Sequence, residues 1–313
     1  MVITNNLELW SIAGIFIASA LAIGIYIEHH RLHKIHFKEA CFISIGWIAS
    51  AFIFNIVLWY YLKVNFNQTI ATQKALEFFA GYTIEKSLSL DNVFVFALIF
   101  KYFGIPRDYQ RVVLNYGIIS AVILRLIMIL AGVWLINKFH WILYVFGGLL
   151  IISGGKILIQ HYLHKDLDND LSNNFIVNLC NKYLRTTTKI YQDKLIITKN
   201  GKTFITPLFL AMILIEISDV VFATDSIPVI FGITDDPFII ITSNIFAILG
   251  LRSLYFLLAA GLKKFVFLTQ GLAIILIFIG IKMMFGLHLS ILTTLSIIFI
   301  IISICVLLSL LKR

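Results

Sequence analysis

The sequence contains few charged residues for its length. Only 13% of its 313 residues are Asp, Glu, Lys or Arg, whereas 60% are hydrophobic. A typical soluble domain carries about 25% charged residues. The shortage of charge therefore excludes an ordinary soluble protein and indicates a polytopic membrane protein.

Cysteines are also scarce, and Cys41, Cys180 and Cys305 are isolated from one another, without a C-x-x-C pair. This spacing argues against a disulfide framework or a thiol relay. The N-terminus lacks the basic segment and small-residue cleavage site of a signal peptide, so the first apolar stretch is expected to remain as a helix.

The net charge of +9 would suggest nucleic acid as the partner of a soluble domain. No basic stretch has the interleaved aromatic residues of a nucleic-acid-binding surface, so nucleic acid is not expected as a partner here. Lys and Arg concentrated in the cytoplasmic loops of a membrane protein explain the charge better. The lipid bilayer is the expected environment.

Apolar runs near the spanning length of roughly 20 residues predict an all-α, polytopic membrane helical bundle with about nine transmembrane helices. The whole chain, 1–313, is expected to form a single membrane domain. The predicted helices cover about 8–27, 40–62, 76–100, 112–136, 139–160, 206–231, 237–261, 265–286 and 289–311.

Basic residues alternate between the predicted loops. Loops 28–39, 101–111, 161–205 and 262–264, together with the C-terminal tail, are rich in Lys and Arg, whereas the loops between them are poor in both. The positive-inside rule therefore predicts an N-terminus outside, a cytoplasmic loop at 161–205 and a cytoplasmic C-terminus.

Two segments, 76–160 and 206–286, repeat the same motifs in the same order. Glu85-x5-Asp91-Asn92 matches Asp219-x5-Asp225-Ser226, and each is followed by Phe-Gly-Ile, Leu-Arg and Gly-x-Lys. Each repeat holds three helices, so the second must enter the membrane inverted relative to the first. Two N-terminal helices (8–62) precede the repeats and one helix (289–311) follows them. Such inverted repeats are typical of secondary transporters, although a duplication without a shared mechanism would leave the same pattern.

Five carboxylates fall within apolar stretches of the two repeats. A charged residue at the centre of a membrane helix costs about 2.5–3.5 kcal/mol, and such residues usually mark a path for ions or protons. Together with Asn92 and Ser226 they form a set of hard oxygen donors suited to Mg²⁺, Ca²⁺ or Mn²⁺. The five are Glu85, Asp91, Glu216, Asp219 and Asp225.

Glu85 and Asn92 share one helical face, whereas Asp91 and Asp225 fall about 100° away from the corresponding faces. Either these two aspartates serve a second face, or the helix opens locally. Pro228 makes local opening plausible in the second repeat.

The buried acids can also be explained as an ion-pair lattice, neutralised by Arg125, Arg252 and Lys86. The two interpretations are compatible, since arginines can balance an empty metal site. Two further clusters are better explained as wet polar segments than as metal sites. They are the histidines at 29, 30, 33 and 36 and the acidic run Asp166–Asp170, which lacks the Gly and Glu of a calcium loop.

Three long strings resemble the TerC family, most closely its Alx-type branch. They are Ile84-Glu-Lys-Ser-Leu-Ser-Leu-Asp-Asn-Val-Phe-Val-Phe96, Glu216-Ile-Ser-Asp-Val-Val-Phe-Ala-Thr-Asp-Ser-Ile-Pro228 and Thr242-Ser-Asn-Ile-Phe-Ala-Ile-Leu-Gly-Leu-Arg-Ser-Leu-Tyr255. The resemblance covers nearly the whole chain. It implies an inner-membrane exporter of manganese whose metal path is formed by Glu85, Asp91, Asn92, Glu216, Asp219, Asp225 and Ser226.

The sequence departs from the family pattern at Gly24, where the family usually has an Asp late in the first helix. The loss of this carboxylate leaves both main motifs intact but bears on metal affinity and proton coupling.

We therefore expect a divalent-cation exporter of the inner membrane, with Mn²⁺ as the cargo and no cofactor. The alternative is a membrane assembly or stress-response scaffold with structural buried charges. No nucleophile–base pair can be assembled, so an enzyme is not expected. The sequence leaves the coupling ion and the oligomeric state open.

Overall fold

The structure is a computed structural model that describes residues 6–29, 37–139, 141–162, 186–187, 190–199, 201–259, 267–287 and 289–311. Almost all of these residues are helical. The helices are α1 (Leu7–His29), α2 (Phe37–Asn65), α3 (Gln68–Tyr102), α4 (Arg107–Lys138), α5 (Ile142–Tyr162), α7 (Pro207–Phe231), α8 (Pro237–Leu249), α9 (Leu251–Ala259), α10 (Leu268–Met284) and α11 (Ile291–Leu311).

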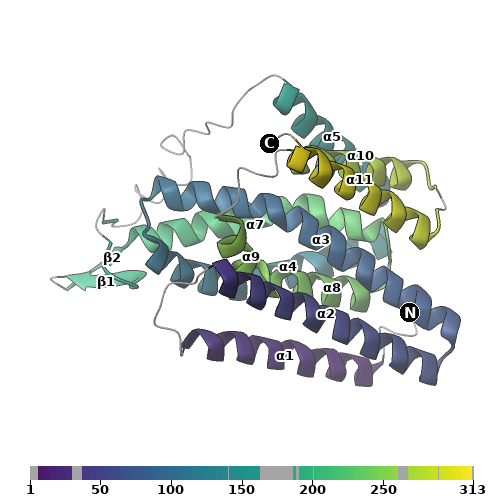
Figure 1. Cartoon of the computed structure of the whole chain (residues 1–313), viewed down its shortest axis with the longest axis horizontal. Helices are drawn as coiled ribbons and strands as arrows, with labels where there is room; N and C mark the ends of the chain where they lie inside the picture. The colour runs from purple at the N-terminus through teal and green to yellow at the C-terminus, as the bar shows by residue number, and fades with distance from the viewer. Residues whose placement is uncertain are drawn as a thin grey trace.

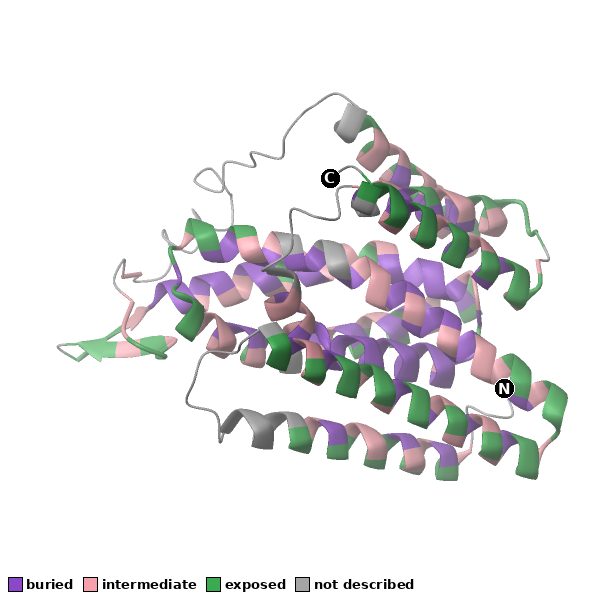
Figure 2. Cartoon of the chain, in the orientation of Figure 1, coloured by how far each residue is buried: buried purple, intermediate pink, exposed green. Residues whose placement is uncertain are grey.

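Helix α8 lies at the centre of the bundle and is contacted by α1, α2, α3 and α4. Every residue of α8 from Phe238 to Leu249 is buried. Helices α5, α10 and α11 form a second group beside α3 and α7 (Figure 1). Buried residues are concentrated in α3, α7 and α8 (Figure 2). Most of the polar residues discussed below lie on these helices.

The outward faces of the helices are apolar rather than polar. Phe42 of α2 and Leu311 of α11 are each 79% exposed, and large aliphatic side chains stand out along α4, α5 and α11. Six helical segments of the described residues are long and apolar enough to cross a membrane. Hydrophobic surface of this extent is explained by contact with lipid.

Each of the nine predicted spans overlaps a helix of the structure, and the all-α membrane fold is confirmed. The predicted boundaries were less accurate. α3 begins at Gln68 rather than near 76, because the Asn67 side chain accepts a hydrogen bond from the Ile70 amide at 2.8 Å and caps the helix. The span predicted at 237–261 is divided at Gly250 into α8 and α9. The count of nine membrane crossings stays a prediction.

The segment predicted as a cytoplasmic loop, 161–205, contains an antiparallel hairpin that the sequence analysis did not foresee. Strand β1 (Ile196–Lys199) pairs with β2 (Lys202–Ile205), and the hairpin projects from one end of the bundle (Figure 1). The sequence Asn200-Gly201 between the strands is a strong hairpin signal, and Gly201 has the positive φ of 70° that such turns require. Most of the remaining loop, with Cys180 and the acidic run, lies outside the described residues.

Helices α5 and α10 approach each other closely at glycines. A Cβ atom at Gly154 would lie 2.6 Å from the Ala273 carbonyl oxygen, whereas one at Gly155 would meet nothing within 4 Å. Backbone atoms cannot move aside as a flexible side chain can. A methyl group at Gly154 should therefore lower the free energy of unfolding by about 1–3 kcal/mol.

We expect Gly154→Ala to lower the thermal unfolding temperature of the purified protein and Gly155→Ala, at the adjacent position, to leave it nearly unchanged. Equal unfolding temperatures for the two variants would contradict the close α5–α10 contact.

Candidate cation site

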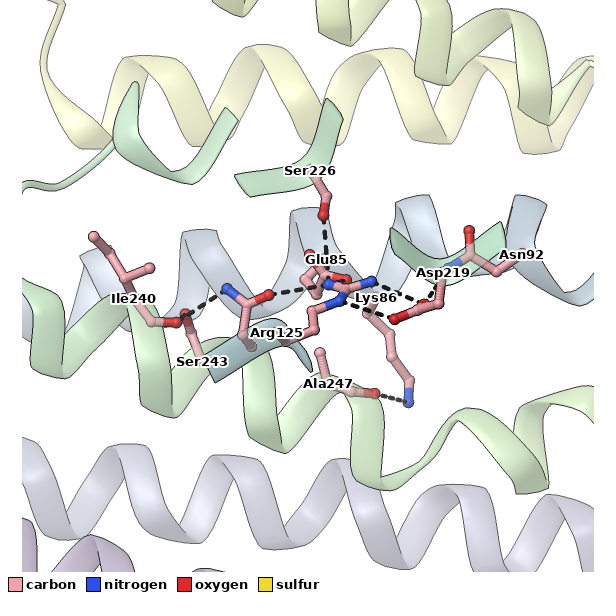
Figure 3. A network of polar contacts seen from close by, with 10 residues as sticks. Glu85, Lys86, Asn92, Arg125, Asp219, Ser226, Ile240, Ser243 and Ala247 are labelled. Carbon is pink, nitrogen blue, oxygen red and sulfur yellow. Dashed lines mark hydrogen bonds and ion pairs between the residues drawn. The ribbon is translucent and has the colours of Figure 1, made fainter. Parts of the chain in front are cut away.

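The polar centre of the protein is organised around Arg125 of α4, whose side chain is only 2% exposed. Its guanidinium donates to the Glu85 carboxylate of α3 and to both carboxylate oxygens of Asp219 of α7, at 3.2 and 3.4 Å. Nη1 also donates to Ser226 at 3.4 Å and to Asn244 of α8 at 3.1 Å. Figure 3 shows Glu85, Asp219 and Ser226 directed at the Arg125 side chain.

The two repeated motifs therefore meet at one point. Glu85 is fully buried and Asp219 is 3% exposed, although the two are far apart in the sequence. Asn92 of the first motif donates to the Asp219 Oδ1 atom at 3.3 Å. Contacts of α3 with both α7 and α8 bring these side chains together in the interior.

The site is not fully satisfied by these hydrogen bonds. Glu85 Oε2 is buried and has no hydrogen-bond partner among the described residues. Since a buried polar atom without a hydrogen bond is costly, this oxygen is available to a ligand. An orphaned carboxylate oxygen beside other oxygen donors fits a hard divalent cation.

Asp225 lies on a second face of α7, away from the Arg125 hydrogen bonds. Its carboxylate accepts a hydrogen bond from Ser153 of α5 at 2.8 Å. It nevertheless lines the same cavity of about 70 Å³ as Glu85, Asn92 and Arg125. The local opening suggested by Pro228 was wrong, because α7 is continuous from Pro207 to Phe231 with Pro228 inside it.

Glu216 lies apart from this cavity. It lines a smaller one of about 20 Å³ together with Asp219, Gly117 and Arg252. Neither carboxylate oxygen of Glu216 has a hydrogen-bond partner among the described residues, and the neighbouring Ser120 hydroxyl donates to carbonyls of its own helix. A Cβ atom at Gly117 would lie 3.3 Å from Glu216 Oε1, so glycine gives the carboxylate its room.

The other two cations that were expected to balance the acids have different hydrogen-bond partners. The Lys86 ammonium donates to the Ala247 carbonyl of α8 at 3.1 Å (Figure 3). Arg252 of α9 donates to the side-chain oxygen of Asn115 of α4. Arg125 bridges Glu85 of the first motif and Asp219 of the second.

The structure does not describe the surroundings of every predicted site residue. Asp91 and Gly24 lie in α3 and α1, but their side-chain surroundings fall outside the described part of the chain, as does most of the histidine cluster. Within that part, no three His, Cys, Asp or Glu side chains converge as metal ligands do. At the centre, the Arg125 guanidinium stands between the Glu85 and Asp219 carboxylates.

Sequence reasoning missed three participants: Asn244, Asn115 and Ser153. Asn244 is fully buried, and its Nδ2 atom donates a hydrogen bond to the Ile240 carbonyl at 3.0 Å. Its signal was the polar triplet Thr242-Ser243-Asn244 within the mainly apolar stretch Phe238–Leu249. Asn115 and Ser153 carry no comparable signal, because single polar residues are common in long membrane helices.

The chain is similar to known membrane proteins over most of its length. The profile of the integral membrane protein TerC family matches residues 70–313, which include every helix from α4 onward and nearly all of α3. Alx of Escherichia coli, named as a candidate membrane-bound redox modulator, is 44% identical over 277 residues, covering 88% of this chain and 85% of that protein.

An uncharacterised membrane protein of Rickettsia bellii is 41% identical over 273 residues, 87% of this chain and 86% of the relative. No solved structure matches the chain. The family match covers well over half of the chain, and the Alx relative is similar across most of its own length. The protein is a member of the TerC family of integral membrane proteins.

Proposed function

We propose that this protein exports a divalent metal cation, with Mn²⁺ as the expected cargo, from the cytoplasm across the inner membrane. One observation carries the proposal: Glu85 and Asp219, from different repeats, converge on a single buried cation. Buried ionisable residues at the interface of two repeats are typical of the binding sites of secondary transporters.

The donor chemistry supports a hard metal. Carboxylate, amide and hydroxyl oxygens surround the centre, and the described residues around it include no cysteine or histidine. This donor set suits Mn²⁺, Mg²⁺ or Ca²⁺ better than copper. We retain as the proposed metal path Glu85, Asp91, Asn92, Glu216, Asp219, Asp225 and Ser226. Glu85, Asn92, Asp225 and Ser226 line the larger cavity, whereas Glu216 and Asp219 line the smaller one. The ion would therefore pass these residues in sequence rather than bind all of them together.

Contacts between the two repeats support an alternating-access mechanism. Each helix of the first repeat contacts its counterpart in the second: α3 with α7, α4 with α8, and α5 with α10. Arg125 donates to Asn244, which precedes Arg252 in the second repeat, and Arg252 donates to Asn115, which precedes Arg125 in the first. An inverted repeat with a two-fold axis would produce such a reciprocal pair.

The second candidate is a scaffold whose buried ion pairs hold the bundle together. The observation in its favour is the Arg125–Glu85–Asp219 network, which links three helices. Buried ion pairs are poor sources of net stability, however, because desolvation offsets their attraction. A purely structural role therefore explains less about these residues than a role in ion binding.

The name of the Alx relative suggests a redox role as an alternative to transport. Within the described residues the cysteines are Cys41 of α2 and Cys305 of α11, and both are free thiols. Neither belongs to a C-x-x-C motif. We therefore favour metal export over direct thiol exchange as the activity.

The proposed orientation, from the basic loops, has the N-terminus outside and the C-terminus in the cytoplasm.

Measurement of manganese tests the function directly. Cells that lack the gene should accumulate more manganese after a manganese challenge than cells that carry it, by elemental analysis. The purified protein in liposomes should move Mn²⁺ to a trapped metal-sensitive dye. Equal cell manganese in both strains, together with no flux of Mn²⁺, Mg²⁺ or Ca²⁺ in liposomes, would contradict metal transport.

A further inference from the structure

We propose that the Arg125 guanidinium is a tethered cation that occupies the place of the metal in the ion-free transporter, and that Asn244 becomes an additional metal ligand once Arg125 withdraws. The proposal rests on the metal-export function above. It adds a competing role for Arg125 and a binding role for a residue outside the two repeated acidic motifs.

The geometry places Arg125 where an ion would bind. Its nitrogens are surrounded by oxygens of Glu85, Asp219, Ser226 and Asn244, contributed by α3, α7 and α8. A cation held by converging oxygens from several helices has the surroundings of a bound metal ion. Here the cation is covalently attached to α4.

Among the groups joined by hydrogen bonds at this point, one cation faces two anions. One guanidinium faces two buried carboxylates, Glu85 and Asp219, and Glu85 Oε2 has no hydrogen-bond partner among the residues that the structure describes. Lys86, the next residue along α3, directs its ammonium to the Ala247 carbonyl rather than to either carboxylate. A divalent ion would match both carboxylates, so metal and guanidinium compete for the same two acids.

Asn244 is already oriented as a ligand. Its Nδ2 atom donates to the Ile240 carbonyl one helical turn earlier, at 3.0 Å, and this hydrogen bond turns the Oδ1 atom toward Arg125, 3.1 Å away. The amide cannot reverse without losing both interactions, which leaves a fixed oxygen acceptor at the site. The same oxygen would coordinate a hard metal ion.

Space is present for the exchange. Arg125 lines the cavity of about 70 Å³, and its partner Asp219 lines the smaller cavity on the Glu216 side. The Arg125–Asp219 pair thus lies where the two cavities approach each other. Withdrawal of the guanidinium would join them, and its return to Glu85 and Asp219 would favour release of the ion.

The experiment compares Mn²⁺ binding by the purified full-length protein, measured by calorimetry in detergent, with Mn²⁺ flux in liposomes. If Arg125 leaves the site free in one molecule in ten, Arg125→Gln should tighten the apparent Kd about tenfold, because the competing state is removed. Flux should fall, because the cation that favours release is gone. Tighter binding with slower transport is the expected result.

Two further variants keep the test decisive. Arg125→Lys retains a charge but cannot bridge both carboxylates as a planar guanidinium does, so its Kd should lie between those of the wild type and Arg125→Gln. Asn244→Ala, which removes the proposed ligand, should weaken Mn²⁺ binding when it is combined with Arg125→Lys. A folded Arg125→Lys protein with unchanged or weaker binding would overturn the competition.

Lys74 offers a matched control. Its ammonium lies 2.7 Å from Glu77 and 3.4 Å from Asp236, both buried, so it too bridges two carboxylates, but outside both cavities. Lys74→Gln should leave Mn²⁺ affinity and flux unchanged. An equal gain in affinity would show that any stripped acid pair binds metal, which overturns the proposal. Flux by the wild type with no tightening in the Arg125 variants overturns only this inference, whereas absence of wild-type flux overturns the function.

Discussion

Asp225→Asn is expected to abolish manganese efflux while the protein accumulates in the membrane at normal levels. Asp225 lines the larger cavity, yet its carboxylate accepts a hydrogen bond from the neutral Ser153 and not from Arg125. The amide keeps the volume and can still accept from Ser153, so the fold loses little. It removes the negative charge, and apparent affinity for a divalent ion should fall by at least about tenfold.

This substitution separates the two candidate functions more cleanly than any change at the central ion pair. A transporter should lose flux with its structure intact, whereas a scaffold should be indifferent to a carboxylate outside the Arg125 network. Ser153→Ala is the matched control: it removes the hydrogen bond but leaves the charge, and it should retain most of the efflux. Normal cell manganese in a strain that carries Asp225→Asn would remove Asp225 from the proposed path.

The sequence predicted the fold class and the family because membrane spans and long motifs are local signals. Apolar runs required only length and composition, and each of the nine ranges meets a helix. Boundaries depended on single side chains instead. The early start of α3 follows from the Asn67 cap, and the interruption of the span at 237–261 follows from Gly250. Windowed hydropathy does not register either residue.

The site was predicted as a set of residues but not as an arrangement. Helical spacing identified Glu85, Asn92 and Asp219 as members, and the structure brings them together. That Glu216 would line a separate cavity, and that Arg125 would stand between Glu85 and Asp219, depends on the packing of α3, α4 and α7. Such tertiary contacts leave no periodic pattern, so Asn244 and Ser153 were found only from the coordinates.

The hairpin illustrates a signal that was present and not used. Asn200-Gly201 lies between two short β-branched stretches, which is a standard hairpin pattern. The segment was interpreted from its hydrophilic composition and its position between spans alone. Composition described the loop as polar, whereas turn chemistry would have predicted its strands.

Simultaneous replacement of Arg125, Glu85 and Asp219, the central ion-pair network, with apolar residues is expected to give a stable protein that transports no Mn²⁺. Arg125→Leu alone leaves Glu85 and Asp219 buried without their cation, and removing one partner of a buried pair costs about 3–5 kcal/mol. We therefore expect low membrane levels for this variant in the absence of metal. Added Mn²⁺ should raise its unfolding temperature, because the ion can replace the missing charge.

Adding Glu85→Met and Asp219→Leu to Arg125→Leu removes the unpaired charges, and apolar replacements of a buried ionic cluster are often neutral or stabilising. The triple variant should therefore recover wild-type membrane levels, measured by immunoblot, but show no Mn²⁺ flux in liposomes and no stabilisation by the metal. Since packing alone would then suffice for folding, the charges would be retained for ion movement. A triple variant as unstable as Arg125→Leu would instead assign the network a structural role that apolar packing cannot supply.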